Sequence, residues 1–508
     1  MSRRVTLELN RVEGDLEIDV EVADGRVVDA WCRGTLYRGF EQLMIGRAPL
    51  DALAITPRVC GICSTSHLMA SVMALENAMA VAPPPGAIRV RNICQMAETA
   101  QSDLRQTFLM FAIDLCRPQY AAQLFFARAT AAFAEQTGRI WHGALDQSRK
   151  LVQIVAHFAG QWPHSSHMVP GGVTTPEITH RSLHALQHLH EVEDWLADEV
   201  YGGDLEEFLA IADGPGLEAW LDAHPGALAL LDEAMRGAGL DRLGHGAAIL
   251  LSYGCHPAPD AWTPHDPVAA RALPAGLLTR SDTTVTAFDP LLIGEDTSHA
   301  WFQDSQTSRH PADGSTVPRY LPDGDRYTWN KAPRYDGRVV QVGPIAQLAV
   351  GGDTLMAELF HRGGDTPWLR QLARLRRLAH DVVRLRGELE TLVRTPSPEL
   401  YVGGKRPAEG RGFGLVEATR GSLGHWLSFE KNRITGFQII SPTSWNASPR
   451  DAAGVRGHWE SSLLGLTVDD EDNPLLIGHV IRSHDPCLVC AVHVATLGSR
   501  QLPNTWRL

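Results

Sequence analysis

Two Cys-x-x-Cys pairs lie near opposite ends of the 508-residue chain. The first pair is Cys60 and Cys63, and the second is Cys487 and Cys490. Thiolate sulfur selects late or borderline metals over Mg²⁺ and Ca²⁺. Four thiolates that folding brings together therefore predict a soft-metal site. Such a site requires the two ends of the chain to meet in space.

Paired Cys-x-x-Cys motifs have two common alternatives, a structural zinc site and a thiol–disulfide redox centre. Zinc ribbons usually place their pairs within about 15–20 residues of each other, whereas almost the whole chain separates these two. A redox centre needs only one pair. The spacing therefore favours another metal, and structural zinc stays as the generic alternative.

The composition is that of a globular protein, with 44% hydrophobic and 21% charged residues. The net charge of −13 argues against nucleic acid as a partner, because a polyanion is repelled overall. The N-terminus alternates polar and apolar residues, unlike a signal peptide, and no apolar run reaches the roughly 18 residues of a membrane span. Eight cysteines are few for this length and indicate a reducing compartment.

The hydrophobic pattern predicts an α+β fold that is mainly helical, with a central helix bundle, a small N-terminal β-sheet and short peripheral strands. Residues 4–35 alternate as strands do, and residues 250–350 have the composition of loops with short strands. Helical periodicity covers four ranges: 87–115, 119–160 with a break near Gly138, 181–201 and 367–393.

We predict one compact unit over residues 1–493, because the cysteines lie at both ends and the helices lie between them. Its parts are a β-hairpin or sheet (1–35), a helix bundle (87–250 and 367–394) and a C-terminal metal-binding part (395–493).

The residues around the cysteines extend the pattern. The first pair lies in Arg-x-Cys-Gly-x-Cys-x-x-x-His at 58–67, and the second in Asp-Pro-Cys-x-x-Cys-x-x-His at 485–493. Together they resemble the paired signatures of the large, catalytic subunit of nickel–iron hydrogenases. Further motifs resemble that family, in the family's order, along essentially the whole chain: 11–14, 38–41, 170–172, 331–335, 342–344, 417–421 and 442–446.

The resemblance implies an oxidoreductase that cleaves dihydrogen reversibly and heterolytically into protons and electrons. It implies a nickel ion held by Cys60, Cys63, Cys487 and Cys490. Cys63 and Cys490 would also bridge to an iron that carries cyanide and carbon monoxide ligands. The protein then has to supply sulfur, a dry pocket and well-placed charge.

The resemblance also assigns roles around the metals. Cys487 matches the terminal thiolate that accepts the proton when dihydrogen splits, and Glu13 matches the carboxylate that carries it away, although spacing alone makes Glu13 a solvated strand residue. Arg420 matches an arginine whose charge lies over the open metal position, and Asp485 matches an aspartate that pairs with it. Thr443 matches a residue whose hydroxyl donates a hydrogen bond to cyanide.

A separate magnesium site is implied by Glu41, His493 and a backbone carbonyl near Ile439. Carboxylate and carbonyl oxygen suit a hard cation, whereas imidazole is unusual for one. His67 matches a histidine that hydrogen-bonds near the ligands without being a ligand itself.

Two other patterns are expected to carry no chemistry. The Gly-x-Gly-x-Gly run at 410–414 lacks the spacing of a nucleotide-binding loop. Histidines on helical stretches, among them His142, His157 and His190, are expected to be packing or surface residues.

Three departures from the family pattern lie near the metals. Asp15 stands where the family often has histidine, and Thr419 where it often has proline. Ser102 falls where many members carry an aspartate, although the neighbouring Asp103 leaves that alignment open. These changes bear on oxygen tolerance and catalytic bias and not on the class of chemistry.

The resemblance further implies partners and processing. No additional cysteine cluster is present for iron–sulfur centres, so an iron–sulfur small subunit is implied as an obligate partner. A maturation endopeptidase would remove residues 494–508 after His493 once nickel-insertion factors have acted. The chain would be cytoplasmic, or exported or membrane-associated only through the small subunit.

Two alternatives of other classes share the fold. One is a regulatory hydrogenase that senses dihydrogen with low turnover, although such members typically lack a cleavable tail. The other is a quinone-reductase subunit that has lost the metal site, which the retention of all four cysteines disfavours.

Overall fold

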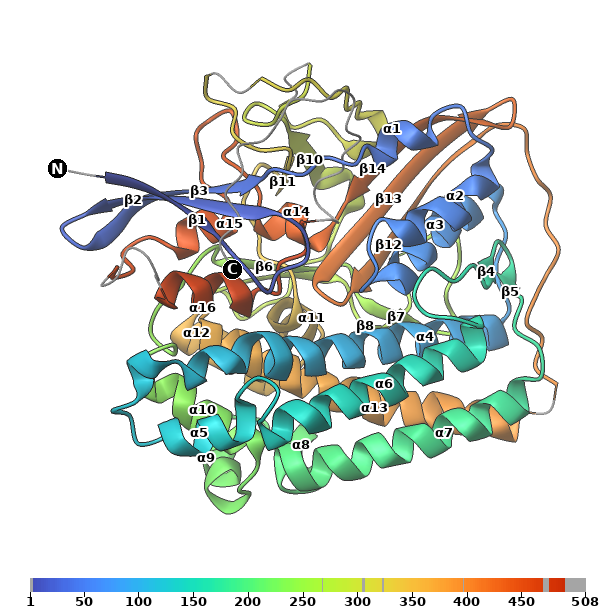
Figure 1. Ribbon diagram of the computed structural model, residues 1–508. Coiled ribbons are helices and arrows are strands. Elements are labelled where there is room, and N and C mark those ends of the chain that lie inside the picture. The colour runs from blue at the N-terminus through green and yellow to red at the C-terminus, as the bar shows by residue number, and fades with distance from the viewer. Residues whose placement is uncertain are drawn as a thin grey trace.

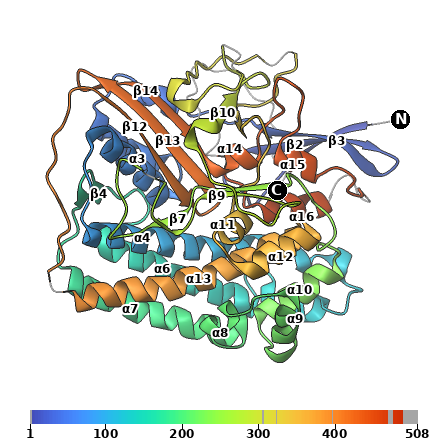
Figure 2. The ribbon, with the colours of Figure 1, turned by 180° about the vertical axis from the view of Figure 1, so that it is seen from behind.

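The computed structural model describes residues 3–266, 268–303, 307–321, 324–395, 397–468 and 475–488. Long helices form a layer on one side of the molecule, and the larger sheets lie on the other side (Figure 1). The view from behind shows the same two layers (Figure 2). This arrangement confirms the α+β class. Within the described residues, no helix combines the length and the apolar composition that crossing a membrane requires.

Four long helices make up most of the helical layer. They are α4 (Pro85–Leu104), α6 (Arg139–Ala159), α7 (Ile178–Trp195) and α13 (Pro367–Arg394). Both α4 and α7 pack against α6 and against α13. The predicted break precedes α6 at Gly138, where an ideal Cβ would lie 2.5 Å from the carbonyl oxygen of Ala132.

Shorter helices and turns surround these four. They are a π-helical turn that extends α4 (Arg105–Phe111), α5 (Phe126–Phe133), α8 (Leu205–Leu209), α9 (Gly214–Ala223), α10 (Ala227–Gly237), α11 (Pro344–Val350) and α12 (Thr354–Gly363). Thr366 caps the N-terminus of α13, because its hydroxyl oxygen accepts a hydrogen bond from the Leu369 N–H at 3.1 Å.

The N-terminal residues form the sheet that their alternation predicts. Its antiparallel strands are, in order, β1 (Arg3–Glu8), β2 (Leu16–Ala23) and β3 (Arg26–Gly34). Leu16, Ile18 and Val20 on β2 are buried in a cluster with residues of α15 (His458–Ser462) and α16 (Leu475–Ser483). Apolar burial therefore joins the beginning of the chain to its C-terminal part.

A second three-stranded sheet was not predicted from the sequence. Its antiparallel strands are, in order, β12 (Gly410–Ala418), β13 (Gly421–Glu430) and β14 (Arg433–Ile440). Strand β12 lies against helix α3 (Ser64–Met79), which begins directly after Cys63.

Glycines on alternate positions of β12 allow this close approach. An ideal Cβ at Gly414 would lie 2.0 Å from the carbonyl oxygen of Ala70, and one at Gly412 would lie 2.2 Å from that of Ala74. Because alternate strand residues share a face, the Gly-x-Gly-x-Gly run presents bare backbone to α3. The run is a packing surface for a helix, consistent with the absence of a nucleotide-binding loop.

The remaining strands are short. They pair as β4 (Met168–Val169) with β5 (Gly172–Val173), β6 (Ile249–Ser252) with β9 (Gly276–Thr279), β7 (Cys255–Pro257) with β8 (Arg271–Leu273), and β10 (Ile293–Asp296) with β11 (Ala332–Tyr335). Most lie in 250–350, where the composition predicts loops with short strands. Three short helices complete the fold: α1 (Phe40–Met44), α2 (Ala52–Ile55) and α14 (Pro442–Asn446).

Candidate metal centre

Three of the four predicted cysteine ligands lie together. The Sγ atoms of Cys60, Cys63 and Cys487 are all within 4.8 Å of one another, and those of Cys60 and Cys487 are 3.5 Å apart. Each of the three residues is at most 3% exposed. Cys490 lies outside the described residues. The fold thus gathers at least three thiols from both ends of the chain in a site shielded from water.

The first pair is positioned by the start of α3. Cys63 is the residue before the helix, and the Ile62 N–H donates to Cys60 Sγ at 3.3 Å. The carboxylate of Glu98 on α4 accepts hydrogen bonds from the backbone N–H groups of Thr65 and Ser66 at 2.8 and 3.0 Å. Glu98 therefore caps the helix in place of a local capping residue.

Cys487 is held by backbone contacts with two distant segments. The Glu13 N–H donates to the Pro486 carbonyl at 3.1 Å, and the Leu488 N–H donates to the Glu13 carbonyl at 2.6 Å. The Cys487 N–H donates to the hydroxyl oxygen of Thr443 at 3.2 Å. Thr443 accepts this bond with its oxygen and keeps its own proton available as a donor.

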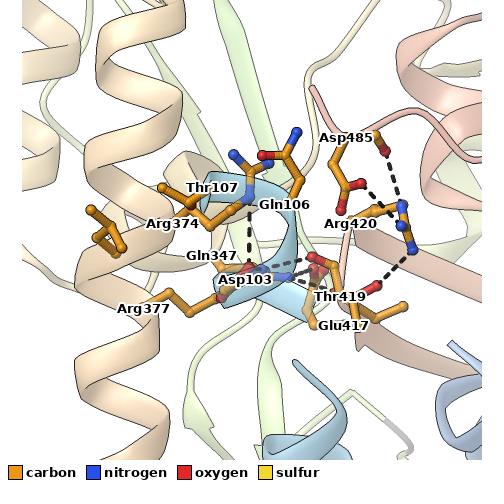
Figure 3. Close-up of polar contacts among 12 residues, drawn as sticks. Asp103, Gln106, Thr107, Gln347, Arg374, Arg377, Glu417, Thr419, Arg420 and Asp485 are labelled. Atoms are coloured by element: carbon orange, nitrogen blue, oxygen red, sulfur yellow. Dashed lines mark hydrogen bonds and ion pairs between the residues drawn. The ribbon is translucent and has the colours of Figure 1, made fainter. Parts of the chain in front are cut away.

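Arg420 lies at the tip of the hairpin between β12 and β13, because Ala418 pairs with Gly421 and leaves a two-residue turn. Its Nε donates to the Asp485 carbonyl, and one Nη donates to the Asp485 carboxylate, both at 3.0 Å (Figure 3). Both side chains are buried. Burial opposes the charge on Arg420, but Asp485 and the thiols, Cys487 foremost, raise its pKa well above the usual value. The site therefore holds a permanent positive charge.

Glu13 lines a cavity of about 80 Å³ beside the cysteines, together with Ile62, Arg105, Arg420 and Asp485. The side chain is half-buried. Burial raises the pKa of Glu13, the Coulombic influence of Cys60 raises it further, and Arg420 opposes this shift. A carboxyl group with a raised pKa binds a proton more readily at neutral pH.

A buried group of ion pairs and hydrogen bonds, which we call the clamp, lies beside Arg420 and Asp485 (Figure 3). Asp103 on α4 pairs with Arg377 on α13, whose Nε donates to the Asp103 carboxylate at 2.9 Å. Arg377 also donates to the Thr419 carbonyl at 2.7 Å, and Arg374 donates to the Ser483 carbonyl at 3.2 and 3.3 Å. Two helices thereby fix both segments that carry Arg420 and Asp485. Burial raises the pKa of Asp103 to about 6, although Arg377 opposes the shift.

His67 lies one turn into α3 and contacts another buried histidine. Its Nδ1 is 3.0 Å from Nε2 of His425, whose Nδ1 is 2.8 Å from the Ser71 hydroxyl. Burial lowers the pKa of His67 to about 4, so its ring is neutral at pH 7. Its Nε2 is buried and has no hydrogen-bond partner among the described residues.

The predicted magnesium ligands are partly described. The Glu41 carboxylate accepts hydrogen bonds from the Ile439 N–H at 2.8 Å and from the Lys331 ammonium at 3.0 Å. Lys331 also pairs with Glu295 at 2.7 Å. Two carboxylates therefore surround one ammonium in a buried pocket. His493 and residues 494–508 lie outside the described residues.

Two positioning groups were missed in the sequence, namely Glu98 and the Arg374–Arg377 pair. Nothing local marks Glu98, because its hydrogen-bond partners come from another helix. Arginines on a long amphipathic helix usually indicate a solvated face. Only Asp103 carried a signal, since it lies beside the position where the family often has an aspartate.

The donor set fits the implied metal. Buried thiols are the ligands that a soft or borderline metal prefers over a hard one, and the fixed charge of Arg420 offsets their negative charge. Among the described residues, this is the one group of three or more His, Cys, Asp or Glu side chains that meets metal-binding distances.

Comparisons with known proteins agree with this geometry. The family model for nickel-dependent hydrogenase matches residues 38–143, 232–360 and 372–493. The chain is 32% identical over 530 residues to the periplasmic NiFeSe hydrogenase large subunit of Desulfomicrobium baculatum, covering 98% of this chain and 96% of that protein. It is 27% identical over 592 residues to the hydrogenase-2 large chain of Escherichia coli, with 97% and 98% covered. A solved structure of the NiFeSe hydrogenase from Dm. baculatum matches with a TM-score of 0.82 at 30% identity, covering 97% of this chain and 100% of that one.

Proposed function

This chain belongs to the nickel-dependent hydrogenase family and is an oxidoreductase that acts on dihydrogen, and from that premise we propose that it cleaves dihydrogen reversibly at a nickel–iron centre held by four cysteines. The observation that carries the proposal is the buried convergence of Cys60, Cys63 and Cys487. Cys490 would be the fourth cysteine to hold this centre, and Cys63 and Cys490 would also hold the iron with its cyanide and carbon monoxide. Residues 1–493 act as one catalytic unit.

The bound metals supply the two-electron chemistry that cleaves dihydrogen. The chain supplies the proton acceptors. The Cys487 thiolate takes the first proton, and the Glu13 carboxylate, whose backbone pairs with the segment around Cys487, carries it into the adjoining cavity. The raised pKa of Glu13 supports this role, because a general acid–base works best with a pKa near the operating pH.

Arg420 and Thr443 shape the remaining surroundings of the metals. The Arg420 guanidinium is fixed by Asp485 and would supply positive charge beside the bound metals. The Thr443 hydroxyl oxygen accepts a hydrogen bond from the Cys487 N–H, and its own O–H would be free to donate a hydrogen bond to a cyanide ligand.

A magnesium ion is proposed between Glu41, the Ile439 carbonyl and His493. The excess of carboxylates over ammonium groups around Lys331 supports a hard cation in this pocket. The magnesium ion would link His493 to Ile439 on β14.

An iron–sulfur small subunit is the proposed electron-transfer partner. The relatives are named large subunits or large chains, and the described residues hold no second group of three cysteines. A maturation endopeptidase would remove residues 494–508 after nickel insertion, in line with a family match that ends at residue 493. Intact-mass analysis of active enzyme should find a chain ending at His493, and a functional chain ending at Leu508 would disprove the cleavage.

Elemental analysis and turnover of the purified complex test the main proposal together. We expect nickel together with iron in excess of nickel, because the small subunit adds the iron of its iron–sulfur centres, and rapid dihydrogen-dependent reduction of an artificial electron acceptor. Zinc as the bound metal would refute the nickel–iron centre. Nickel and iron with very slow turnover would instead identify the sensing alternative.

A further inference from the structure

Four histidines come together on the outer face of the helical layer. His180, His184 and His188 lie four residues apart on α7, and His157 lies opposite them on α6. Ring centroids within this group are 4.5 Å apart for His180 and His184, 5.7 Å for His157 and His184, and 5.4 Å for His157 and His188. We call these four residues the histidine cluster.

The shortest contact in the histidine cluster joins two ring nitrogens. Nε2 of His180 and Nε2 of His184 are 3.2 Å apart. Two imidazole nitrogens bound to one tetrahedral metal ion, each at about 2.0–2.1 Å, lie roughly 3.3 Å apart. The pair therefore already has the spacing that one shared ion imposes, and i, i+4 histidines on one helix face are a known metal-binding arrangement.

His157 adds an independent observation. Its Nε2 is buried and has no hydrogen-bond partner among the described residues. Burial lowers the pKa of His157, and His188 and His184 lower it further, so this imidazole is neutral at pH 7. Arg181, the nearby cation, is turned toward the carbonyls of Pro176 and His157. The cluster therefore holds one unpaired neutral imidazole near the exposed pair, although the ligand nitrogens of His157, His180 and His184 do not all lie within 4.8 Å of one another.

We propose that the histidine cluster is a second transition-metal site, in which His180 and His184 ligate a divalent ion such as Ni²⁺ or Zn²⁺ and His157 is the nearest further imidazole. Neutral imidazole suits these ions and does not suit Mg²⁺ or Ca²⁺. The site is separate from the cysteines, because α7 is at the far edge of the helical layer from α3 (Figures 1 and 2). It does not depend on the catalytic proposal.

The test is Ni²⁺ binding to the enzyme complex as isolated, without a histidine-containing tag and after treatment with a chelator. Equilibrium dialysis with elemental analysis should find nickel beyond the resident content, and the extra nickel should show nitrogen ligation in its X-ray absorption spectrum. The double variant His180→Ala/His184→Ala should weaken this binding at least tenfold. His190→Ala, on the same helix but outside the cluster, should leave it unchanged.

Two results would overturn the proposal. One is the absence of extra nickel in the unaltered enzyme, which would leave His180 and His184 as a hydrogen-bonded pair. The other is equal binding by the double variant. Activity with dihydrogen and the melting temperature should be the same in all three proteins, since the altered side chains are exposed and distant from the cysteines.

Discussion

The cysteine site and the histidine cluster gather metal-binding side chains in opposite ways. Cys60 and Cys487 are 427 positions apart and buried. They meet through long-range packing, in which the N-terminal sheet packs on α15 and α16 and α3 packs on β12. His180 and His184 are four positions apart and exposed, and one helix suffices to place them. The comparison teaches that the buried site depends on the whole fold, whereas the exposed His180–His184 pair depends on one helix. Substitutions should separate the two accordingly.

The largest effect is expected from Cys60→Ala. Loss of a neighbour that only orients a ligand typically costs about 10- to 100-fold in metal affinity or activity, so loss of a ligand should remove both nickel and activity below detection. Elemental analysis and dihydrogen oxidation measure these two outcomes. Cys116→Ala, which removes an isolated cysteine, is the matched control. Full activity in Cys60→Ala would remove this residue from the site.

Glu13→Gln should separate proton transfer from metal binding. The amide keeps the size of the side chain but cannot exchange a proton, so turnover should fall by about 10²- to 10⁴-fold while nickel content stays normal. Glu17→Gln, on the same N-terminal sheet, should retain activity. Normal turnover of Glu13→Gln would show that protons leave by another route.

Asp103→Asn tests the clamp that supports Arg420. It leaves the buried guanidinium of Arg377 without its carboxylate, and a broken buried pair costs about 3 kcal/mol or more of unfolding free energy. Denaturant unfolding measures the change. Asp146→Asn removes an exposed partner of Arg149 and should cost less than about 0.5 kcal/mol. Equal values for the two variants would mean that the clamp is not a stabilising ion pair.

Gly414→Ala should reduce the free energy of unfolding by less than Asp103→Asn does. Its methyl group would meet the Ala70 carbonyl, and overpacking of this kind typically costs about 1–3 kcal/mol. Gly387→Ala, on an exposed part of α13 with open space around it, should instead stabilise by about 0.5–1 kcal/mol. A stabilising Gly414→Ala would contradict the close contact between β12 and α3.

The sequence predicted those parts of the molecule in which local pattern decides structure. Alternation identified β1 to β3, and helical periodicity identified α4, α6, α7 and α13. The sequence pattern did not predict β12 to β14. The glycines that let β12 approach α3 are typical of loops when the sequence is considered without its packing partner. The position of β12 is determined by its contacts with residues far away in sequence, and the local sequence does not indicate those contacts.

The candidate site shows the same division. The cysteine motifs and their flanks led to Cys60, Cys63, Cys487, Glu13 and Arg420. The sequence did not indicate the roles of Glu98, Arg374 and Arg377, because each forms hydrogen bonds with a backbone group that is far away in sequence. The histidines at 157 and 190 looked alike on helical stretches, yet only His157 faces other imidazoles across a helix pair.

Nickel-edge X-ray absorption of the active enzyme tests the central claim most directly, with His180→Ala/His184→Ala as background so that surface nickel cannot contribute. The account predicts a nickel shell of sulfur atoms with iron as the next neighbour. A shell of nitrogen and oxygen, or nickel without a nearby iron, would contradict the proposal that cysteines from both ends of this chain hold the catalytic metals.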